Sequence, residues 1–164
     1  MEAPRMQDII ARLRAGKKND EGFTLIELLV VVVIIGVLVA IAVPVYLNYR
    51  QGAADKSAQS DVRGAISAVE QYYTNNGNKF PASKSEETGD AKVLELPPLN
   101  ATGGAKATIT LSDKTKLAYY KVDEKSYRIC ATNTGGSDKY FLYDSTAGGS
   151  VSDAGKVLTL ATCS

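Results

Sequence analysis

The chain has 164 residues, with 19 Lys and Arg against 18 Asp and Glu, two Cys and no His. The length allows one modest domain, and the balanced charge disfavours a nucleic-acid-binding protein of the basic kind. Because His is absent, His-based catalytic triads, His metal sites and imidazole acid–base chemistry are excluded.

One long apolar segment lies near the N-terminus. Between residues 23 and 47, 21 of the 25 residues are apolar, and residues 28–47 carry no charge. Twenty-five helical residues rise about 37 Å, more than the roughly 30 Å hydrocarbon thickness of a bilayer. The alternative is a core helix of a soluble protein, for which the remaining chain is too short to cover an apolar rod on all sides. The sequence therefore predicts one membrane span.

The residues before this span are rich in basic side chains. Residues 1–22 carry five Arg and Lys against four Asp and Glu. By the positive-inside rule, the N-terminus is expected in the cytoplasm and everything after Leu47 outside. Ordinary secretory cleavage is disfavoured, because Ala40 and Ala42 are followed by Pro44 and large residues. We therefore expect the span to be retained.

The junction of residues 17–27 reads KKNDEGFTLIE. It resembles the processing site of type IV prepilins, in which a membrane peptidase cuts after a Gly and N-methylates the new terminus. The resemblance implies cleavage between Gly22 and Phe23, a methylated Phe23, and Glu27 as the fifth residue of the mature chain. Gly36 and Pro44 also fall where this family commonly has its Gly and Pro.

The resemblance also implies an architecture and a function. The fold class is α+β, with a long N-terminal transmembrane and amphipathic helix packed on a small antiparallel β-sheet head. The function is that of a structural pilus subunit, held in the cytoplasmic (inner) membrane and polymerised into an extracellular filament for adhesion, motility or DNA uptake. The expected partners are further copies of the chain, the prepilin peptidase and methyltransferase, a pilus assembly platform and the lipid bilayer. No cofactor and no enzymatic activity are expected.

Glu27 is the one charge between residues 23 and 47. A carboxylate in hydrocarbon costs about 2–3.5 kcal/mol, so it is a candidate functional residue. Two interpretations are open. Thr24 and Glu27 have the spacing of a capping box, and an acidic side chain suits the first turn of a helix. Alternatively, cleavage creates a positive α-amino group at Phe23, which Glu27 of a neighbouring, axially staggered subunit neutralises.

Gly36 and Pro44 lie in an otherwise strong helical segment. Pro44 removes one backbone hydrogen bond, and Gly36 weakens the helix by about 1 kcal/mol relative to Ala. The helix between them is therefore expected to bend or melt. The alternative is that Gly and Pro are simply common in membrane helices. The resemblance implies that helicity is lost here on filament assembly.

Residues 48–77 have the pattern of an amphipathic helix. It is predicted to continue the span without a break to about Tyr73 and to end near residues 75–77, where Asn and Gly suit a C-cap. The predicted apolar face consists of Ala54, Ala58, Val62, Ala65, Ile66, Val69, Tyr72 and Tyr73.

Residues 78–164 are predicted to form the connection and the β head. From Asn78 to Gly104 the sequence is a polar connection with one apolar stretch, residues 93–99, and it assigns no regular element securely. Short β-branched and aromatic segments then predict an antiparallel meander, punctuated by Gly pairs at 103–104, 135–136 and 148–149. The predicted strands cover residues 106–111, 116–122, 126–131, 139–143 and 156–162.

Cys130 and Cys163 are both expected outside the membrane, where disulfides persist. A bond between them is expected, with two buried free thiols as the alternative. The resemblance supports the bond, because type IV pilins often tie their C-terminal region to the sheet in this way.

Other functions keep some support. A pseudopilin of a type II secretion or competence system is the sister interpretation, although the chain lacks the Trp of the major pseudopilin calcium loop. Residues 144–153 offer oxygens for Ca²⁺, but an ordinary solvated turn explains them better. Residues 104–130 carry a local charge of +3, which a minor pilin for DNA uptake or adhesion would use and which a solvated face also explains. A catalytic role comes last, because no nucleophile, base and orienting group share a recognisable spacing.

Overall fold

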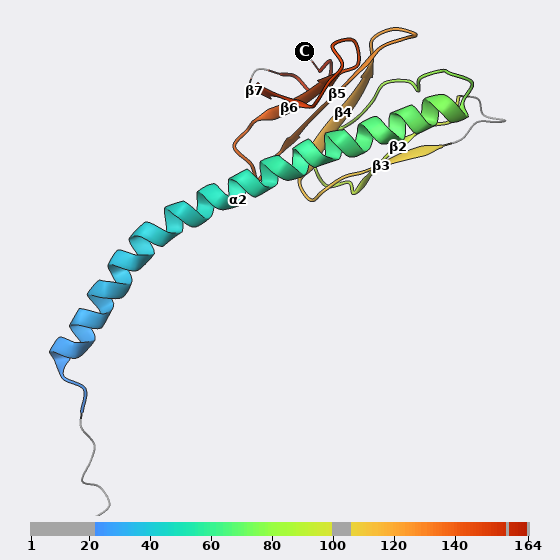
Figure 1. Ribbon diagram of the computed structural model, residues 1–164. Coiled ribbons are helices and arrows are strands. Elements are labelled where there is room, and N and C mark those ends of the chain that lie inside the picture. Colours follow the sequence, from blue (N-terminus) through green and yellow to red (C-terminus); the bar gives the residue numbers. More distant parts are fainter. Residues whose placement is uncertain (1–21, 100–105, 157, 164) are drawn as a thin grey trace, which may run out of the picture. The chain divides into compact units, whose positions relative to one another are not determined.

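A computed structural model describes residues 22–99, 106–156 and 158–163 (Figure 1). The predicted leader therefore lies outside the described residues apart from Gly22, as does the predicted turn at 103–104. The chain divides into two units at Pro44/Val45. One helix, α2 (Leu25–Asn75), begins in the first unit and ends in the second.

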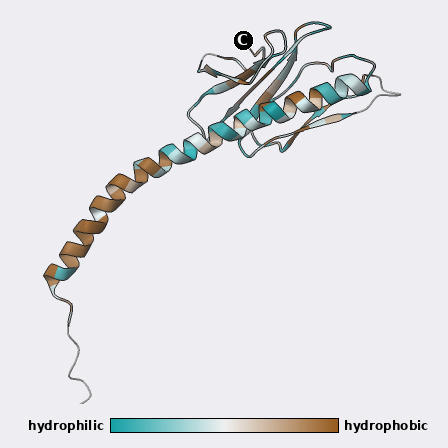
Figure 2. Ribbon diagram, in the orientation of Figure 1, coloured by the Kyte–Doolittle hydropathy of each residue, from teal (hydrophilic) through white to brown (hydrophobic). Residues whose placement is uncertain are grey.

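The first part of α2 is apolar on all sides. Every residue from 22 to 53 is exposed in the single chain, and hydrophobic colouring predominates along the N-terminal half of the helix, interrupted by a hydrophilic turn near its start (Figure 2). Among the described residues, α2 is the one helix long and apolar enough to cross a membrane. It continues through Gly36 and Pro44 as one helix, so neither residue ends it in the single chain.

The second part of α2 has one buried face. Ala58, Val62, Ala65, Val69 and Tyr72 are each at most 1% exposed, at alternating spacings of four and three residues. This spacing places all five on one side of a 3.6-residue helix. The prediction of an amphipathic segment is confirmed for these five positions, and the three others on the predicted face are half-buried.

The helix ends in a Schellman motif. Gly77 has a φ of 65°, and the N–H of Asn78 donates to the carbonyl of Tyr73 over 3.0 Å. Asn76 Nδ2 donates to the carbonyl of Tyr72 over 2.9 Å. A left-handed residue at this position favours Gly, because Gly has no Cβ. The predicted end near residues 75–77 is confirmed.

Two antiparallel sheets face this helix segment. The larger has the order β1-β4-β5-β6-β7, and the smaller pairs β2 with β3. Leu117 of β4 lies opposite Ala131 of β5, and Cys130 of β5 opposite Leu142 of β6. The strands are β1 (Lys84–Glu86), β2 (Val93–Leu96), β3 (Ala107–Thr110), β4 (Thr115–Lys121), β5 (Tyr127–Asn133), β6 (Tyr140–Asp144) and β7 (Ser152–Gly155).

Four of the five predicted strands are confirmed with small shifts, and the fifth is wrong. The described residues of 156–162 contain no strand, and the last strand is β7 at Ser152–Gly155. The segment after β7 instead contributes Leu160 and Cys163 to a small apolar cluster with Cys130 and Ala118 of the sheet. Its apolar residues therefore cover the second face of the sheet rather than extending its edge.

The connection also differs from the expectation. Two strands, β1 and β2, lie within residues 78–99, where no regular element was predicted. β3 pairs with β2, and β1 pairs with β4. The predicted meander is therefore correct only from β4 to β6. Because β1 has three residues and β2 four, neither is long enough to show a clear period in the sequence.

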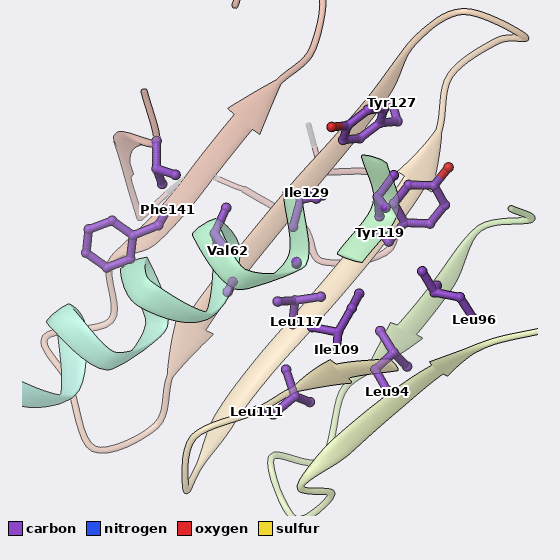
Figure 3. Close-up of a cluster of buried hydrophobic side chains, with 14 of the residues drawn as sticks. Val62, Leu94, Leu96, Ile109, Leu111, Leu117, Tyr119, Tyr127, Ile129 and Phe141 are labelled. Carbon is purple, nitrogen blue, oxygen red and sulfur yellow. The ribbon is translucent and has the colours of Figure 1, made fainter. Parts of the chain in front are cut away.

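The main core lies between α2 and the inner faces of both sheets (Figure 3). Val62 of the helix faces Leu117, Ile129 and Phe141 of the larger sheet, and Leu94 and Ile109 come from the smaller one. A helix and a sheet that each bury one apolar face form the usual two-layer solution. The predicted α+β fold of a helix on a small antiparallel head is confirmed.

Candidate functional site

Gly22 and Phe23 precede the first turn of α2. The side chain of Phe23 is 78% exposed, and a Cβ built on Gly22 would meet nothing within 4 Å. Packing inside this chain therefore does not require Gly at position 22. A requirement for Gly there has to come from another molecule.

Glu27 and Thr24 form a reciprocal capping box. The N–H and the hydroxyl of Thr24 donate to Glu27 Oε2 over 2.8 and 2.7 Å. The N–H of Glu27 donates to Thr24 Oγ1 over 3.3 Å. These bonds satisfy backbone donors that the first turn of a helix leaves open. The capping interpretation of Glu27 therefore describes the single chain.

The surroundings of Glu27 are apolar. A shallow hollow on α2 is lined by Glu27 together with Phe23, Ile26, Val30 and Val31. Each of these side chains is exposed in the single chain. The carboxylate thus lies at the N-terminal end of an uncovered apolar surface, where lipid or another apolar helix would desolvate it.

Gly36 and Pro44 lie further along the same exposed segment. A Cβ built on Gly36 would meet nothing within 4 Å, so its small size relieves no contact in this chain. Pro44 lies inside α2. A flexible role for the pair stays a prediction about the assembled state.

Three acidic residues of α2 hold the head through hydrogen bonds. Asp55 accepts from the N–H and hydroxyl of Ser137 over 3.0 and 2.6 Å. Asp61, which is 8% exposed, accepts from the N–H and hydroxyl of Ser112 over 2.8 and 2.9 Å. The sequence pattern assigned these acids to the polar side of the helix. Their roles were missed, because no sequence signal showed which distant hydroxyl each would meet.

The third acid, Glu70, accepts from the hydroxyl of Tyr127 over 2.6 Å. Burial of Tyr127 and then this carboxylate raise the phenol pKa, so the ring stays a neutral donor. The ring of Tyr127 also lies 4.9 Å from that of Phe80 and 5.8 Å from that of Tyr119, measured between centroids. Helix, connection and sheet therefore meet at one aromatic cluster.

Cys130 and Cys163 form a disulfide, with their Cα atoms 5.5 Å apart. The predicted pair is confirmed, and the alternative of two free thiols is wrong. Cys130 lies on β5, and Cys163 lies in the segment after β7. The bond holds that segment against the face of the sheet that does not contact α2, where Leu160 covers Ala118 and Leu142.

The carboxylates considered for Ca²⁺ are engaged elsewhere. Asp144 accepts from the Thr146 hydroxyl over 2.6 Å and from Arg128 Nε over 2.8 Å. The Thr146 hydroxyl bond and then the Arg128 guanidinium lower the pKa of Asp144 to about 2. Asp153 pairs with Lys139 over 2.9 Å. Across the described ranges, no group of three or more metal-binding side chains is gathered.

Comparison with known proteins identifies the family. Residues 17–43 match the family model described as the prokaryotic N-terminal methylation motif. A type IV major pilin protein PilE1 of Neisseria gonorrhoeae is 32% identical over 125 residues, which cover 74% of this chain and 57% of that protein. A second PilE1 of the same organism is 31% identical over 126 residues, which cover 74% of each chain. The chain belongs to the type IV pilins.

A shorter match is to a protein of a secretion system. The type II secretion system core protein G of Escherichia coli is 35% identical over 89 residues, which cover 54% of this pilin and 60% of that protein. No solved structure matches the chain. The pilin relatives thus share a longer part of the chain than the secretion protein does.

Proposed function

We propose that this pilin is a structural subunit that is stored in a membrane and polymerised into a surface filament. The observation that carries the proposal is the unburied apolar surface of α2 from Leu25 to Leu47. Exposing so large an apolar surface to water is unfavourable, so the segment needs lipid before assembly and other apolar helices after it. A subunit that is held in lipid and later packs this segment into an apolar filament core meets both needs.

We propose that a prepilin peptidase removes residues 1–22 and that Phe23 is then N-methylated. The support is the motif match over residues 17–43 and the open space at Gly22, where an added Cβ would meet nothing within 4 Å. Gly22→Leu should leave full-length precursor in the membrane, whereas Gly52→Ala, at another uncrowded Gly, should be cleaved normally. N-terminal mass spectrometry of both membrane fractions decides this. A wild-type protein still starting at Met1, or cut after Ala40 or Ala42, would refute the processing.

We propose that Glu27 has a second partner in the filament, the Phe23 amine of a neighbouring subunit. In the single chain its two bonds from Thr24 both end on Oε2. Cleavage would create a new positive charge one residue before Thr24. Between parallel, staggered helices this charge and the Glu27 carboxylate would meet in apolar surroundings. Because breaking a buried pair costs about 3–5 kcal/mol, the pair would fix the stagger of the subunits.

Two variants separate the capping role from the assembly role. Glu27→Gln can reproduce the capping bond but loses the charge, whereas Thr24→Val removes the Thr24 hydroxyl from the cap and keeps the charge. We expect Glu27→Gln subunits to be cleaved and inserted yet almost absent from filaments, and Thr24→Val subunits to assemble. Electron microscopy and immunoblotting of sheared surface material, in a strain lacking the native copy, measure both. Wild-type filament yield from Glu27→Gln would leave Glu27 with capping alone.

The second candidate is a pseudopilin of a secretion or competence system, favoured by the match to core protein G. The two candidates differ in the length of the assembly. A pilin yields long sheared filaments in which this chain is the main component. A pseudopilin or a minor pilin yields none or is present in trace amounts. The copy number of the chain in sheared material therefore distinguishes them.

We further propose a single-pass orientation with the N-terminus inside and the head outside. The basic residues before Phe23 support it. Protease added to spheroplasts should then digest the head of the membrane pool and spare the leader of uncleaved Gly22→Leu. Protection of the head would reverse the orientation.

A further inference from the structure

A groove lies between α2 and two loops of the head. Its helix side is formed by Leu47, Arg50 and Ala54, and its head side by Asp113, Lys114 and Asn133. The groove has a volume of about 510 Å³. All of its residues belong to the same unit, residues 45–164.

The helix side of the groove begins where the apolar span ends. Leu47 is the last residue of the apolar segment, and Arg50 follows three residues later, about 4.5 Å further along the helix axis. Tyr46 and Tyr49 beside them are 59% and 77% exposed, and the Arg50 guanidinium lies 5.8 Å from the centroid of the Tyr46 ring. Tyr and Arg at the end of a span are typical of the headgroup level of a bilayer. The helix side of the groove therefore includes the residues at which the apolar segment ends.

Two cations, Arg50 and Lys114, line the groove with one carboxylate, Asp113, which interacts electrostatically with both Lys92 and Lys114. Within the part of the chain that the structure describes, neither Arg50 nor Lys114 forms an ion pair, whereas Asp113 pairs with Lys92. The helix acid nearest in sequence, Asp55, is bound to the N–H and hydroxyl of Ser137. The groove thus presents a positive charge next to the apolar side chains of Leu47 and Ala54.

The loop that presents Lys114 is held in place from two sides. The carbonyl of Lys114 accepts from the N–H of Thr134 over 3.1 Å, and Asn133 Nδ2 donates to the carbonyl of Asp113 over 2.8 Å. Lys114 has a φ of 62°, a conformation that costs a residue with a side chain some free energy. These hydrogen bonds fix the backbone of the loop from which the Lys114 side chain extends.

We propose that this groove binds the headgroup of an anionic phospholipid while the pilin is held in the membrane. Arg50 and Lys114 would contact the phosphate oxygens, and Leu47 and Ala54 would contact the glycerol carbons. The proposal rests on the membrane-held stage of the proposed function. It adds a lipid as a partner of the head and a device that fixes the depth of the head above the bilayer until assembly.

The test uses the full-length chain in a nonionic detergent, titrated with phosphatidylglycerol or phosphatidylcholine. Native mass spectrometry reads the fraction that carries one lipid. We expect phosphatidylglycerol to be retained preferentially, and Arg50→Gln/Lys114→Gln to weaken its binding by about 30-fold. The matched control Lys79→Gln/Lys125→Gln removes the same charge from exposed positions outside the groove and should bind as the wild type does. Added inorganic phosphate should not displace the lipid, because phosphate lacks the apolar contacts.

Several results would overturn the proposal. The first is equal retention of the two lipids, and the second is an equal loss of phosphatidylglycerol binding in the control variant. The third is displacement of the lipid by inorganic phosphate. The fourth is a dimer that forms in place of the lipid complex and depends on Arg50 and Lys114. If the double variant does not fold, the comparison of the two lipids on the wild-type chain still decides. Incorporation of the chain into nanodiscs is scored separately. A chain that inserts but does not discriminate between lipids refutes only this inference, whereas a chain that does not insert refutes the membrane stage as well.

Discussion

Position 136 shows how closely a head loop approaches α2. A Cβ built on Gly136 would lie 2.1 Å from Asp55 Oδ1 and 3.2 Å from the carbonyl oxygen of Asn133. In Gly136→Ala the Asp55 carboxylate has to turn away and give up its bonds to Ser137. We expect the free energy of unfolding to fall by about 1–3 kcal/mol, measured by urea denaturation of the head.

Two further variants test that reason. Gly64→Ala makes the same change at a helical site with nothing within 4 Å, and it should raise the stability by up to about 1 kcal/mol. In an Asp55→Ala background the Gly136→Ala change should cost much less, since the bonds are already lost. If the losses in the free energy of unfolding from Gly136→Ala and Asp55→Ala are additive, the methyl group of the new Ala side chain does not act through Asp55.

Asp144 makes the free energy of unfolding of the head depend on pH in the acid range. Its pKa is lowered to about 2 by the Thr146 hydroxyl and then by Arg128, and its side chain is 21% exposed. Because the folded pKa lies below the usual value, this carboxylate stabilises the head above about pH 4, and the contribution is lost as the pH falls toward 2. Asp144→Asn should therefore lower the stability at neutral pH by roughly 1–2 kcal/mol and flatten its dependence between those pH values.

Thermal unfolding of the head as a function of pH measures this effect. Asp138→Asn, at an exposed turn, serves as the charge-matched control. If the thermal stability of Asp144→Asn depends on pH as that of the wild type does, other carboxylates are responsible for the effect.

At the scale of elements, the disulfide joins β5 to the segment after β7. The bond links positions 33 residues apart, and closing such a loop contributes roughly 3–4 kcal/mol in the chain-entropy model. In Cys130→Ser/Cys163→Ser the free energy of unfolding should fall by about that amount. Amides of residues 158–163 should lose protection in hydrogen exchange before those of β4 and β5. Cleavage after Gly22 should be unchanged, because the two sites are expected on opposite sides of the membrane.

Simultaneous loss of hydrogen-exchange protection in β4, in β5 and in residues 158–163 would contradict this order. It would mean that the segment after β7 is part of the cooperative core, and that the contact of Leu160 with Ala118 stabilises the whole sheet.

The elements differ in how far the sequence could predict them. The face of α2 around Val62 and Val69 could be read because five turns repeat one period, and β4, β5 and β6 because each is rich in β-branched or aromatic residues. The strand at Lys84–Glu86 could not be read, because it has three polar residues and exists only through its pairing with β4. The segment around Leu160 has the composition of a strand, yet the disulfide and the second apolar cluster hold it across the sheet.

The candidate site divides in the same way. Gly22, Phe23 and Glu27 form a local motif, so the sequence could predict them together. The bonds of Asp55 and Asp61 join residues 82 and 51 positions apart, and no local pattern specifies such partners. Contacts that depend on the tertiary fold therefore appear only in the structure.

For the whole molecule, burial separates the chain into two kinds of surface. Every buried residue among those described lies at or beyond Ala58, and every residue from 22 to 53 is exposed. The head therefore has a complete core of its own, and the apolar part of α2 adds nothing to that core in the single chain. Stability of the head and suitability for a membrane or a filament are properties of different residues.

This separation predicts that the head folds without the apolar segment of α2. A chain of residues 50–164 keeps the buried face of α2, all three acidic contacts of the helix and the disulfide. It should be soluble and monomeric, and its free energy of unfolding should lie within about 1 kcal/mol of that of the full-length head in detergent, since only fraying of the new helix end is added. A chain of residues 64–164 loses the buried side chains of Ala58 and Val62 and the bonds of Asp61 to Ser112. Burial of the Val62 side chain alone contributes about 1.5–3 kcal/mol to the free energy of unfolding, so this shorter chain should be largely unfolded.

Circular dichroism and size-exclusion chromatography of the two oxidised fragments measure the difference. Aggregation of residues 50–164 would mean that the apolar segment takes part in folding the head.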